Sequence, residues 1–154
     1  MVSFFYKSKK LRVRVAALIE NDAGEILLLK QKKKKKDYWL LPGGGIEFGE
    51  SAVNALEREL LEELNIQIEK PEFLLLNENI DPNGGRHLIQ LVFSAKIKSG
   101  EPVLPKKDKI ILDFQYFSRA NLESIEIRPD IKTYLLSNDT RTNSVYLKSE
   151  WINE

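Results

Sequence analysis

Residues Gly44–Ile66 read GGIEFGESAVNALERELLEELNI, and this stretch contains the clearest helix signal of the chain. From Ser51 to Leu64 the apolar side chains recur at steps of three and four residues, which places them on one face of a helix. These apolar positions are Val53, Leu56, Leu60 and Leu64. Glu50 and Ser51 stand where a helix start favours an acid and a capping hydroxyl. The pattern therefore predicts an amphipathic helix over residues 51–64.

Three carboxylates share one side of this helix. The spacings between Glu59, Glu62 and Glu63 are three and four residues, so their side chains project from the same face. Adjacent like charges destabilise a helix unless something neutralises them, and a divalent cation does so well because it prefers carboxylate oxygens. A solvated acidic surface, offset by Arg58 or nearby lysines, is the alternative explanation of the same residues.

A glycine-rich loop precedes the helix. Pro42-Gly43-Gly44-Gly45 comes first and Gly49 follows closer to the helix start. Glycine allows close backbone approach, so amides and carbonyls of Gly43, Gly44 and Gly45 could face a metal ion and phosphate groups. Such a loop is common in turns, but a loop that leads into three aligned carboxylates is much more specific. The combination favours phosphate chemistry over a merely solvated surface.

The stretch resembles the Nudix family, whose signature is G-x5-E-x7-R-E-U-x-E-E-x-G-U, with U a bulky aliphatic residue. Gly44 matches the first glycine, Glu50 the isolated acid, Arg58-Glu59-Leu60-Leu61-Glu62-Glu63 the central motif and Ile66 the last position. Asn65 stands where the family usually has glycine. Asparagine tolerates positive φ better than most residues, so the helix end that this position forms is expected to remain.

The resemblance implies one Nudix domain over residues 1–154, an α/β/α sandwich with a mixed β-sheet. Residue patterns outside the signature agree with this fold, because apolar strand-like segments stand on both sides of it. The expected strands are 11–20 and 25–31, joined as a hairpin, and 38–41, 71–76, 88–97, 110–117 and 144–152. Residues 118–121 predict a short helical turn, and 129–136 a second helix that begins at Pro129. Five successive lysines, Lys32–Lys36, predict an exposed loop.

The resemblance also implies roles for the signature residues. Mg²⁺ or Mn²⁺ would be bound by four groups: the carboxylates of Glu59, Glu62 and Glu63 and the carbonyl of Gly43. Glu50 and Arg58 would form an ion pair that fixes the loop against the helix. The implied reaction is hydrolysis of a pyrophosphate bond in a nucleoside diphosphate linked to another moiety. Nucleotide sugars, ADP-ribose, dinucleoside polyphosphates and nucleoside triphosphates all remain open as substrates.

The sequence gives weaker indications of the substrate contacts and of the general base than of the metal ligands. Gly44, Gly45, Arg86 and His87 are candidate substrate contacts, although a lone histidine is more often structural and Arg86 is equally well explained as a solvated loop cation. The general base would be a signature glutamate or a later acid. The later acids are Asp108 and Asp113, and Glu47 is a further loop acid. Tyr38 and Trp39 either pack beside the loop or stack on a base.

Bulk composition narrows the classes of partner. The 154 residues include 24 basic and 23 acidic side chains, so the net charge of +1 does not require nucleic acid or a membrane. There is no cysteine, which excludes disulfides and thiolate metal sites and fits a cytoplasmic location. We expect a nucleotide-type small molecule as partner, no signal peptide or membrane span, and leave a homodimer open. Two alternatives remain: a Nudix module that binds nucleotide without cleaving it, and an RNA-binding or RNA-processing protein that uses Lys32–Lys36.

Overall fold

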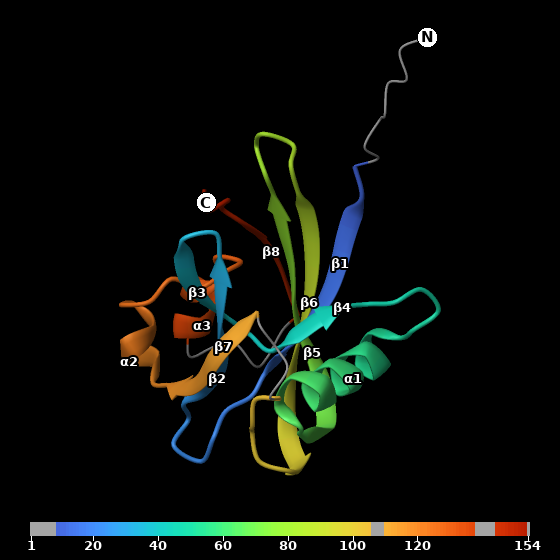
Figure 1. Cartoon of the computed structure of the whole chain (residues 1–154), viewed down its shortest axis with the longest axis vertical. Helices are drawn as coiled ribbons and strands as arrows, with labels where there is room; N and C mark the ends of the chain where they lie inside the picture. The colour runs from blue at the N-terminus through green and yellow to red at the C-terminus, as the bar shows by residue number, and fades with distance from the viewer. Residues whose placement is uncertain (1–8, 106–109, 138–143, 154) are drawn as a thin grey trace.

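The computed structural model describes residues 9–105, 110–137 and 144–153, which form two β-sheets between helices. The strands are β1 (Leu11–Leu18), β2 (Ile26–Lys33), β3 (Lys36–Leu40), β4 (Gly43–Gly45), β5 (Gln67–Ile80), β6 (His87–Ser99), β7 (Ile111–Phe117) and β8 (Val145–Ser149). The helices are α1 (Ala52–Leu64), α2 (Arg119–Leu122) and α3 (Lys132–Leu136). Figure 1 shows α1 on one side of the sheets and the short α2 and α3 on the other.

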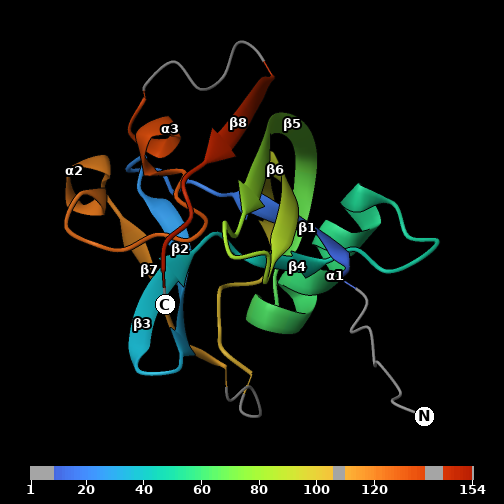
Figure 2. The same cartoon turned by 90° about the horizontal axis from the view of Figure 1, so that it is seen from above.

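The larger sheet is mixed, as the sequence predicted. Its strand order is β4-β1-β6-β5-β8, and the pairs β1–β6 and β5–β8 are parallel while the other two pairs are antiparallel. The smaller sheet, β3-β2-β7, is antiparallel throughout. Together with the helices on both sides, this arrangement is the expected α/β/α sandwich (Figure 2). Among the described residues, no helix has the length and apolar character needed to cross a membrane.

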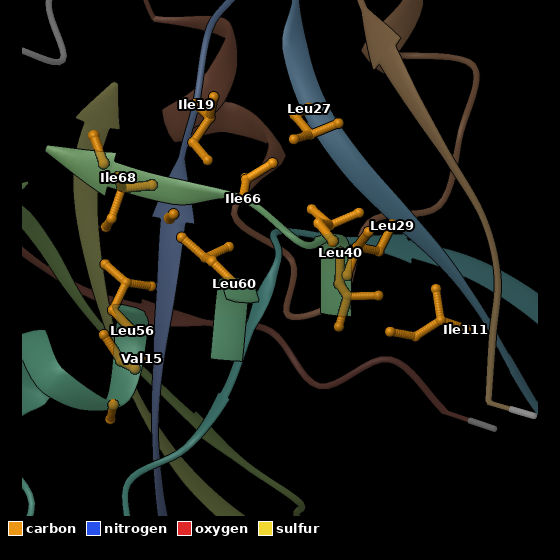
Figure 3. Close-up of a cluster of buried hydrophobic side chains, with 14 residues drawn as sticks. Val15, Ile19, Leu27, Leu29, Leu40, Leu56, Leu60, Ile66, Ile68 and Ile111 are labelled. Atoms are coloured by element: carbon orange, nitrogen blue, oxygen red, sulfur yellow. The ribbon is translucent and has the colours of Figure 1, made fainter. Parts of the chain in front are cut away.

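Two hydrophobic clusters fill the layers. Alternate residues of a strand face opposite sides, so Val15 and Ala17 of β1 join one cluster while Ala16 and Leu18 join the other. The first cluster also includes the apolar face of α1, and Figure 3 shows Leu56 and Leu60 of this helix among its residues. This double burial explains why β1 continues as an unbroken apolar run instead of alternating with polar residues.

The predicted hairpin of the first two strands is only partly correct. Asn21 does form the turn, and its side-chain oxygen accepts hydrogen bonds from the backbone N–H of Ala23 and Glu25 at 3.0 and 2.9 Å. Beyond the isolated bridge between Glu20 and Ile26, however, β1 and β2 separate into different sheets. Both strands are buried on two faces, so each needs its own sheet neighbours and the pair cannot stay together.

The lysine tract is exposed but is not the loop that its charge predicted. β2 continues to Lys33 and β3 starts at Lys36, so only Lys34 and Lys35 form the turn, with Lys34 at a φ of 57°. Alternation along the strands sends successive ammonium groups to opposite faces, which lowers their mutual repulsion. Asp37 stands opposite Lys32 in the register of β2 and β3 and so places a carboxylate beside the tract, where it also lies 3.3 Å from Nζ of Lys30.

The second helix, predicted over residues 129–136, starts later than expected. Helix α3 begins at Lys132, three residues after Pro129, and covers only five residues. Residues 128–130 form a bend instead of a helical turn. Ile127 forms an isolated bridge with Trp39 of β3, and the backbone N–H of Arg128 donates to the carbonyl of Trp39 at 2.9 Å. The short helical turn expected at 118–121 is confirmed as α2. The remaining strands match the predicted segments with different ends, except β4: Gly43–Gly45 pairs with β1 as a short strand where the sequence predicted a loop.

Candidate functional site

Helix α1 begins and ends where the sequence predicted. The hydroxyl of Ser51 accepts a hydrogen bond from the backbone N–H of Asn54 at 3.1 Å, which caps the first turn. At the other end Asn65 adopts the left-handed conformation, with φ 54° and ψ 37°. Asparagine therefore ends this helix as glycine would. The two caps therefore define where α1 begins and ends next to residues 43–50.

Two glycines of this loop, Gly43 and Gly44, are required by close contacts. A Cβ on Gly43 would lie 2.1 Å from the carbonyl oxygen of Val15, and its φ of 145° is also strained for other residues. A Cβ on Gly44 would lie 2.2 Å from Cδ of Glu59. Nothing stands within 4 Å of such an atom on Gly45. Gly43 and Gly44 therefore bring the loop directly against β1 and α1.

Glu63 ties the helix to the same loop. Its carboxylate accepts a hydrogen bond from the backbone N–H of Gly43 at 2.9 Å. Gly43 is also held by β1, where it pairs with Ala16. The loop backbone is consequently fixed on two sides, and the glutamate carboxylate lies beside it.

Arg58 connects the other signature acids. It donates from Nε and Nη2 to the two carboxylate oxygens of Glu50 at 2.8 and 3.0 Å, and from Nη1 to Glu59 at 2.9 Å. Nη2 also donates to the carbonyl of Gly45 at 3.1 Å, and a weaker contact of 3.5 Å reaches Glu62. These hydrogen bonds lower the pKa of Glu50 and raise that of Arg58, so the pair stays charged. The ion pair implied by the resemblance is therefore present in the structure.

The three helix carboxylates have the donor chemistry of a site for a divalent cation. They offer only hard oxygen atoms, and the missing side chain at Gly44 leaves the space that Glu59 occupies. Within residues 9–105, 110–137 and 144–153, however, no three acidic or histidine side chains converge on one point. Glu59 and Glu62 contact Arg58 instead, while Glu63 contacts the Gly43 amide. A cation that fits this donor set would have to share these carboxylates with Arg58 or draw them away.

A cleft of about 890 Å³ opens between the two sheets beside the loop. Gly43, Gly44, Gly45, Glu59 and Glu63 line one end of it. Its further lining includes Arg12 and Arg14 of β1, Lys32 and Lys33 of β2, Tyr38 of β3, Arg86, Leu88, Arg128, Trp151 and Ile152. The lining of the cleft therefore combines the carboxylates of Glu59 and Glu63 with basic and apolar side chains. Basic side chains of this kind can bind the phosphate groups of a ligand.

Arg14 is a site residue that the sequence reasoning missed. It pairs in register with Gly45, and its Nη2 donates to the carbonyl of Leu41 at 3.2 Å. Burial lowers the pKa of its guanidinium, while Glu63, Tyr38 and Glu59 act in the opposite direction. The alternating LRVRV segment was the available signal, because it places Arg12 and Arg14 on one strand face.

A row of polar side chains continues from Arg14 across the larger sheet. Arg14 pairs with Gln90 of β6, and Gln90 pairs with Asn77 of β5. Gln90 and Asn77 are buried, yet Nε of Arg14, Oε1 of Gln90 and both amide atoms of Asn77 have no hydrogen-bond partner among the described residues. Buried groups of this kind are normally paired, so the row marks a polar interior next to the cleft.

The other candidate residues divide between the cleft and the rest of the surface. Arg86 lines the cleft, but His87 does not: its Nε2 lies 2.6 Å from Glu78 on the opposite face of β6. The expected substrate contact of His87 is therefore not supported by its position. Asp113 is exposed on β7 away from the cleft lining, and Asp108 lies outside the described residues.

The loop acid and the aromatic pair have distinct positions. Glu47 is exposed, and its backbone N–H donates to Glu50 at 3.0 Å. Tyr38 lines the cleft with the guanidinium of Arg128 4.8 Å from its ring centre. Trp39 packs edge-on against Phe117 at 4.6 Å, in the second hydrophobic cluster. Of the two aromatic residues, only Tyr38 is available to a ligand.

Comparisons with known proteins agree with this geometry. The chain is 47% identical over 62 residues to the RNA pyrophosphohydrolase of Ruthia magnifica subsp. Calyptogena magnifica, covering 40% of this chain and 34% of that protein. It is 39% identical over 92 residues to the ADP-ribose pyrophosphatase of Methanocaldococcus jannaschii, covering 58% and 53%. The chain thus spans about a third to a half of the length of these two relatives.

A solved structure covers much more of the molecule. The crystal structure of a MutT NUDIX hydrolase from Burkholderia pseudomallei superposes with a TM-score of 0.70 at 30% identity, covering 86% of this chain and 99% of that one. The family model described as NUDIX domain matches residues 10–136 and so includes the loop, helix α1 and every strand except β8. Taken with the Gly43–Gly45 loop and the carboxylates of α1, this match shows that the chain belongs to the NUDIX family.

Proposed function

We propose that this chain hydrolyses the pyrophosphate bond of a nucleoside diphosphate linked to a further group, and that it requires Mg²⁺ or Mn²⁺. The observation that carries the proposal is the contact of Glu59 and Glu63 with the Gly43–Gly44 backbone at one end of the cleft. The names of the two relatives, RNA pyrophosphohydrolase and ADP-ribose pyrophosphatase, support the reaction class. They differ in substrate, so they leave the group beyond the diphosphate open.

Glu59, Glu62, Glu63 and the carbonyl of Gly43 are the proposed ligands of the cation. When bound, the cation would neutralise phosphate charge and lower the pKa of a water molecule. Glu50 and Arg58 are positioning residues in this proposal. Their bidentate pair and the bond from Arg58 to the Gly45 carbonyl fix the loop relative to the helix.

The chain itself supplies groups for the diphosphate. Gly44 and Gly45 carry no side chain that would keep a phosphate from the backbone, and Arg14 lies opposite Gly45. A largely desolvated guanidinium attracts phosphate more strongly than a solvated one, because the local dielectric is lower. Arg86, on the same cleft, is a further proposed contact. Asp113, a later acid that the sequence suggested as the general base, does not line the cleft, so we propose a carboxylate of α1 as the proton acceptor.

Replacing Glu62 tests the proposal with little risk to folding, since its side chain is 61% exposed. Glu62→Gln should lower turnover of a cleaved nucleotide roughly a hundredfold or more, the scale seen when a group that stabilises transition-state charge is removed. Glu57→Gln is the matched control, because Glu57 is an exposed acid of the same helix that is neither a proposed ligand nor, among the described residues, an ion-pair partner of Arg58. Product formation would be measured by chromatography over a panel of nucleotide sugars, ADP-ribose, dinucleoside polyphosphates and triphosphates.

Metal removal provides the second arm of this test. Activity of the wild-type protein should disappear in EDTA and return with added Mg²⁺ or Mn²⁺. Full turnover in EDTA, or an unchanged rate in Glu62→Gln, would refute the proposed role of the helix carboxylates. Tight nucleotide binding without product from any member of the panel would instead favour a binding module.

A further inference from the structure

The walls of the cleft carry basic side chains besides Arg14. Arg12 lies on β1, Lys33 ends β2, Arg86 follows the β5–β6 turn, and Arg128 precedes α3. These four residues, here called the cation cluster, come from distant parts of the sequence. All four line the same cleft as Glu59 and Glu63. None belongs to the helix or loop that carries the proposed hydrolysis.

The cation cluster occupies both walls of the cleft. Arg12 pairs in register with Leu88, and Arg86 stands two residues before Leu88, so both arginines project from one face of the larger sheet. Lys33 and Arg128 belong to the other wall. Lys33 is in the smaller sheet, and Arg128 is bonded through its backbone to Trp39 of β3. A ligand between the sheets would therefore meet cations from two directions.

The charges of the cation cluster are only partly compensated. Arg128 pairs with Glu126, but Arg12 and Arg86 form no ion pair with any residue in the described ranges. Asp130 and Glu150 are the acids of this part of the lining. Burial lowers the pKa of Lys33 first, and repulsion from Arg86, Lys34, Arg128 and Arg12 lowers it further. An anion bound among these cations would relieve that repulsion.

Arg12 of the cation cluster is offset along β1 from the position that faces the loop. Arg14 lies opposite Gly45, and Arg12 is two residues nearer the start of β1. Two residues of a strand span about 7 Å, so Arg12 reaches a position beyond a phosphate held at Gly45. Guanidinium groups match phosphate oxygens in geometry as well as charge, which makes phosphate the favoured anion.

We propose that the cation cluster binds a phosphate group additional to the two phosphates of the pyrophosphate that is cut. This inference rests on the proposed function and narrows its substrate. The substrate would be a nucleotide with a third phosphate, supplied either by a longer phosphate chain or by the phosphodiester of a short oligonucleotide. ADP-ribose and nucleotide sugars carry only two phosphates and would leave the cation cluster unused.

Equilibrium binding in EDTA tests the cation cluster without turnover. The probes are ADP, ATP and the adenine dinucleotide with a 5′-diphosphate, titrated by calorimetry into the full chain. Wild-type protein should bind ATP or the dinucleotide at least about tenfold more tightly than ADP, and the tighter of the two identifies the source of the phosphate. The double variant Arg12→Gln/Arg86→Gln should lose most of this gain. Lys96→Gln/Lys98→Gln removes the same charge from β6 away from the cleft and should keep it.

Equal affinity for all three probes, or a gain that survives the double variant, would overturn the proposal. Circular dichroism checks folding, and if the double variant is unfolded, Arg86→Gln alone carries the test with Lys96→Gln as its control. The proposed function fails separately. A protein that hydrolyses nothing with Mg²⁺ or Mn²⁺ but still shows the arginine-dependent gain would refute hydrolysis and retain the extra phosphate site.

Discussion

The guanidinium of Arg58 donates two hydrogen bonds, of 2.8 and 3.0 Å, to the two carboxylate oxygens of Glu50. The two residues stand eight positions apart, Glu50 at the end of the glycine loop and Arg58 two turns into α1. Their bidentate pair is stronger and more directional than a single contact between a lysine and an acid. It fixes the loop by joining it to the helix, and it leaves Nη1 of Arg58 for Glu59.

Glu50→Gln should make the stability of the protein less dependent on pH in the acidic range. Because Arg58 lowers the folded-state pKa of Glu50, the pair stabilises the fold above the unfolded pKa of about 4.5, and this contribution is lost as the pH falls through the lowered value. Urea midpoints of wild type and variant should therefore differ at pH 7 and converge under acid. A constant difference down to pH 2 would contradict the charge-based role of the pair.

Gly44→Ala should damage activity far more than it damages the fold. The added Cβ would stand 2.2 Å from Cδ of Glu59, a flexible side-chain end that can move away and take its carboxylate off the loop. We expect a loss of kcat/KM of roughly a hundredfold with a shift in Tm of only a few degrees. Gly45→Ala, which meets no atom within 4 Å, should lose much less. Equal losses in both variants would argue against the contact with Glu59.

Gly43→Ala gives a contrasting result, because the atom it would meet is backbone. Its Cβ would stand 2.1 Å from the carbonyl oxygen of Val15, at a φ of 145° that other residues rarely adopt. Strand β1 cannot yield as a side chain can, so we expect a loss of stability of about 2 kcal/mol or more. Thermal unfolding of the variant, compared with that of Gly44→Ala, would measure it. An unchanged midpoint would show that β4 can move away from β1.

Local patterns were sufficient to predict helix α1 and its neighbouring loop. The period of the apolar residues, the cap at Ser51 and the left-handed Asn65 all depend on residues close in sequence. The separation of β1 from β2 was not predictable in this way, because an apolar run does not say which sheet covers each face. The prediction of a loop at Lys32–Lys36 was wrong for a related reason. These lysines continue β2 and begin β3 because β2 pairs with both β3 and β7, and charge density alone does not reveal that pairing.

The residues of the candidate site also fall into two groups: those that local sequence predicts and those that only the three-dimensional fold brings together. Glu59 and Glu63 meet the loop because one short segment contains them all, so the signature was enough. Arg12, Arg14 and Arg128 reach the cleft only through the register of the two sheets. His87 shows the opposite error: it follows a cleft residue in sequence, but the alternation of β6 turns it to the other face.

Arg14→Met should separate function from stability. The guanidinium is largely buried with an unpaired Nε, so an apolar side chain of similar length removes a desolvated charge without leaving a large cavity. We expect KM to rise about tenfold or more while the unfolding free energy falls by less than it does in Leu60→Ala. That core variant deletes a fully buried side chain and should cost about 2–5 kcal/mol. A larger loss of stability in Arg14→Met would mean that Arg14 chiefly neutralises Glu59 and Glu63.

His87→Gln should leave kcat/KM within about twofold of wild type, because its ring does not line the cleft and so offers no contact to a transition state there. The ring bonds to Glu78 at 2.6 Å, and Glu78 also accepts a hydrogen bond from the hydroxyl of Tyr146 at 2.6 Å. Both bonds lower the pKa of Glu78, so this trio is a surface network joining β5, β6 and β8. Tyr146→Phe serves as a matched control, since it breaks the same network from the other side. A rise in KM for His87→Gln but not for Tyr146→Phe would return His87 to the list of substrate contacts.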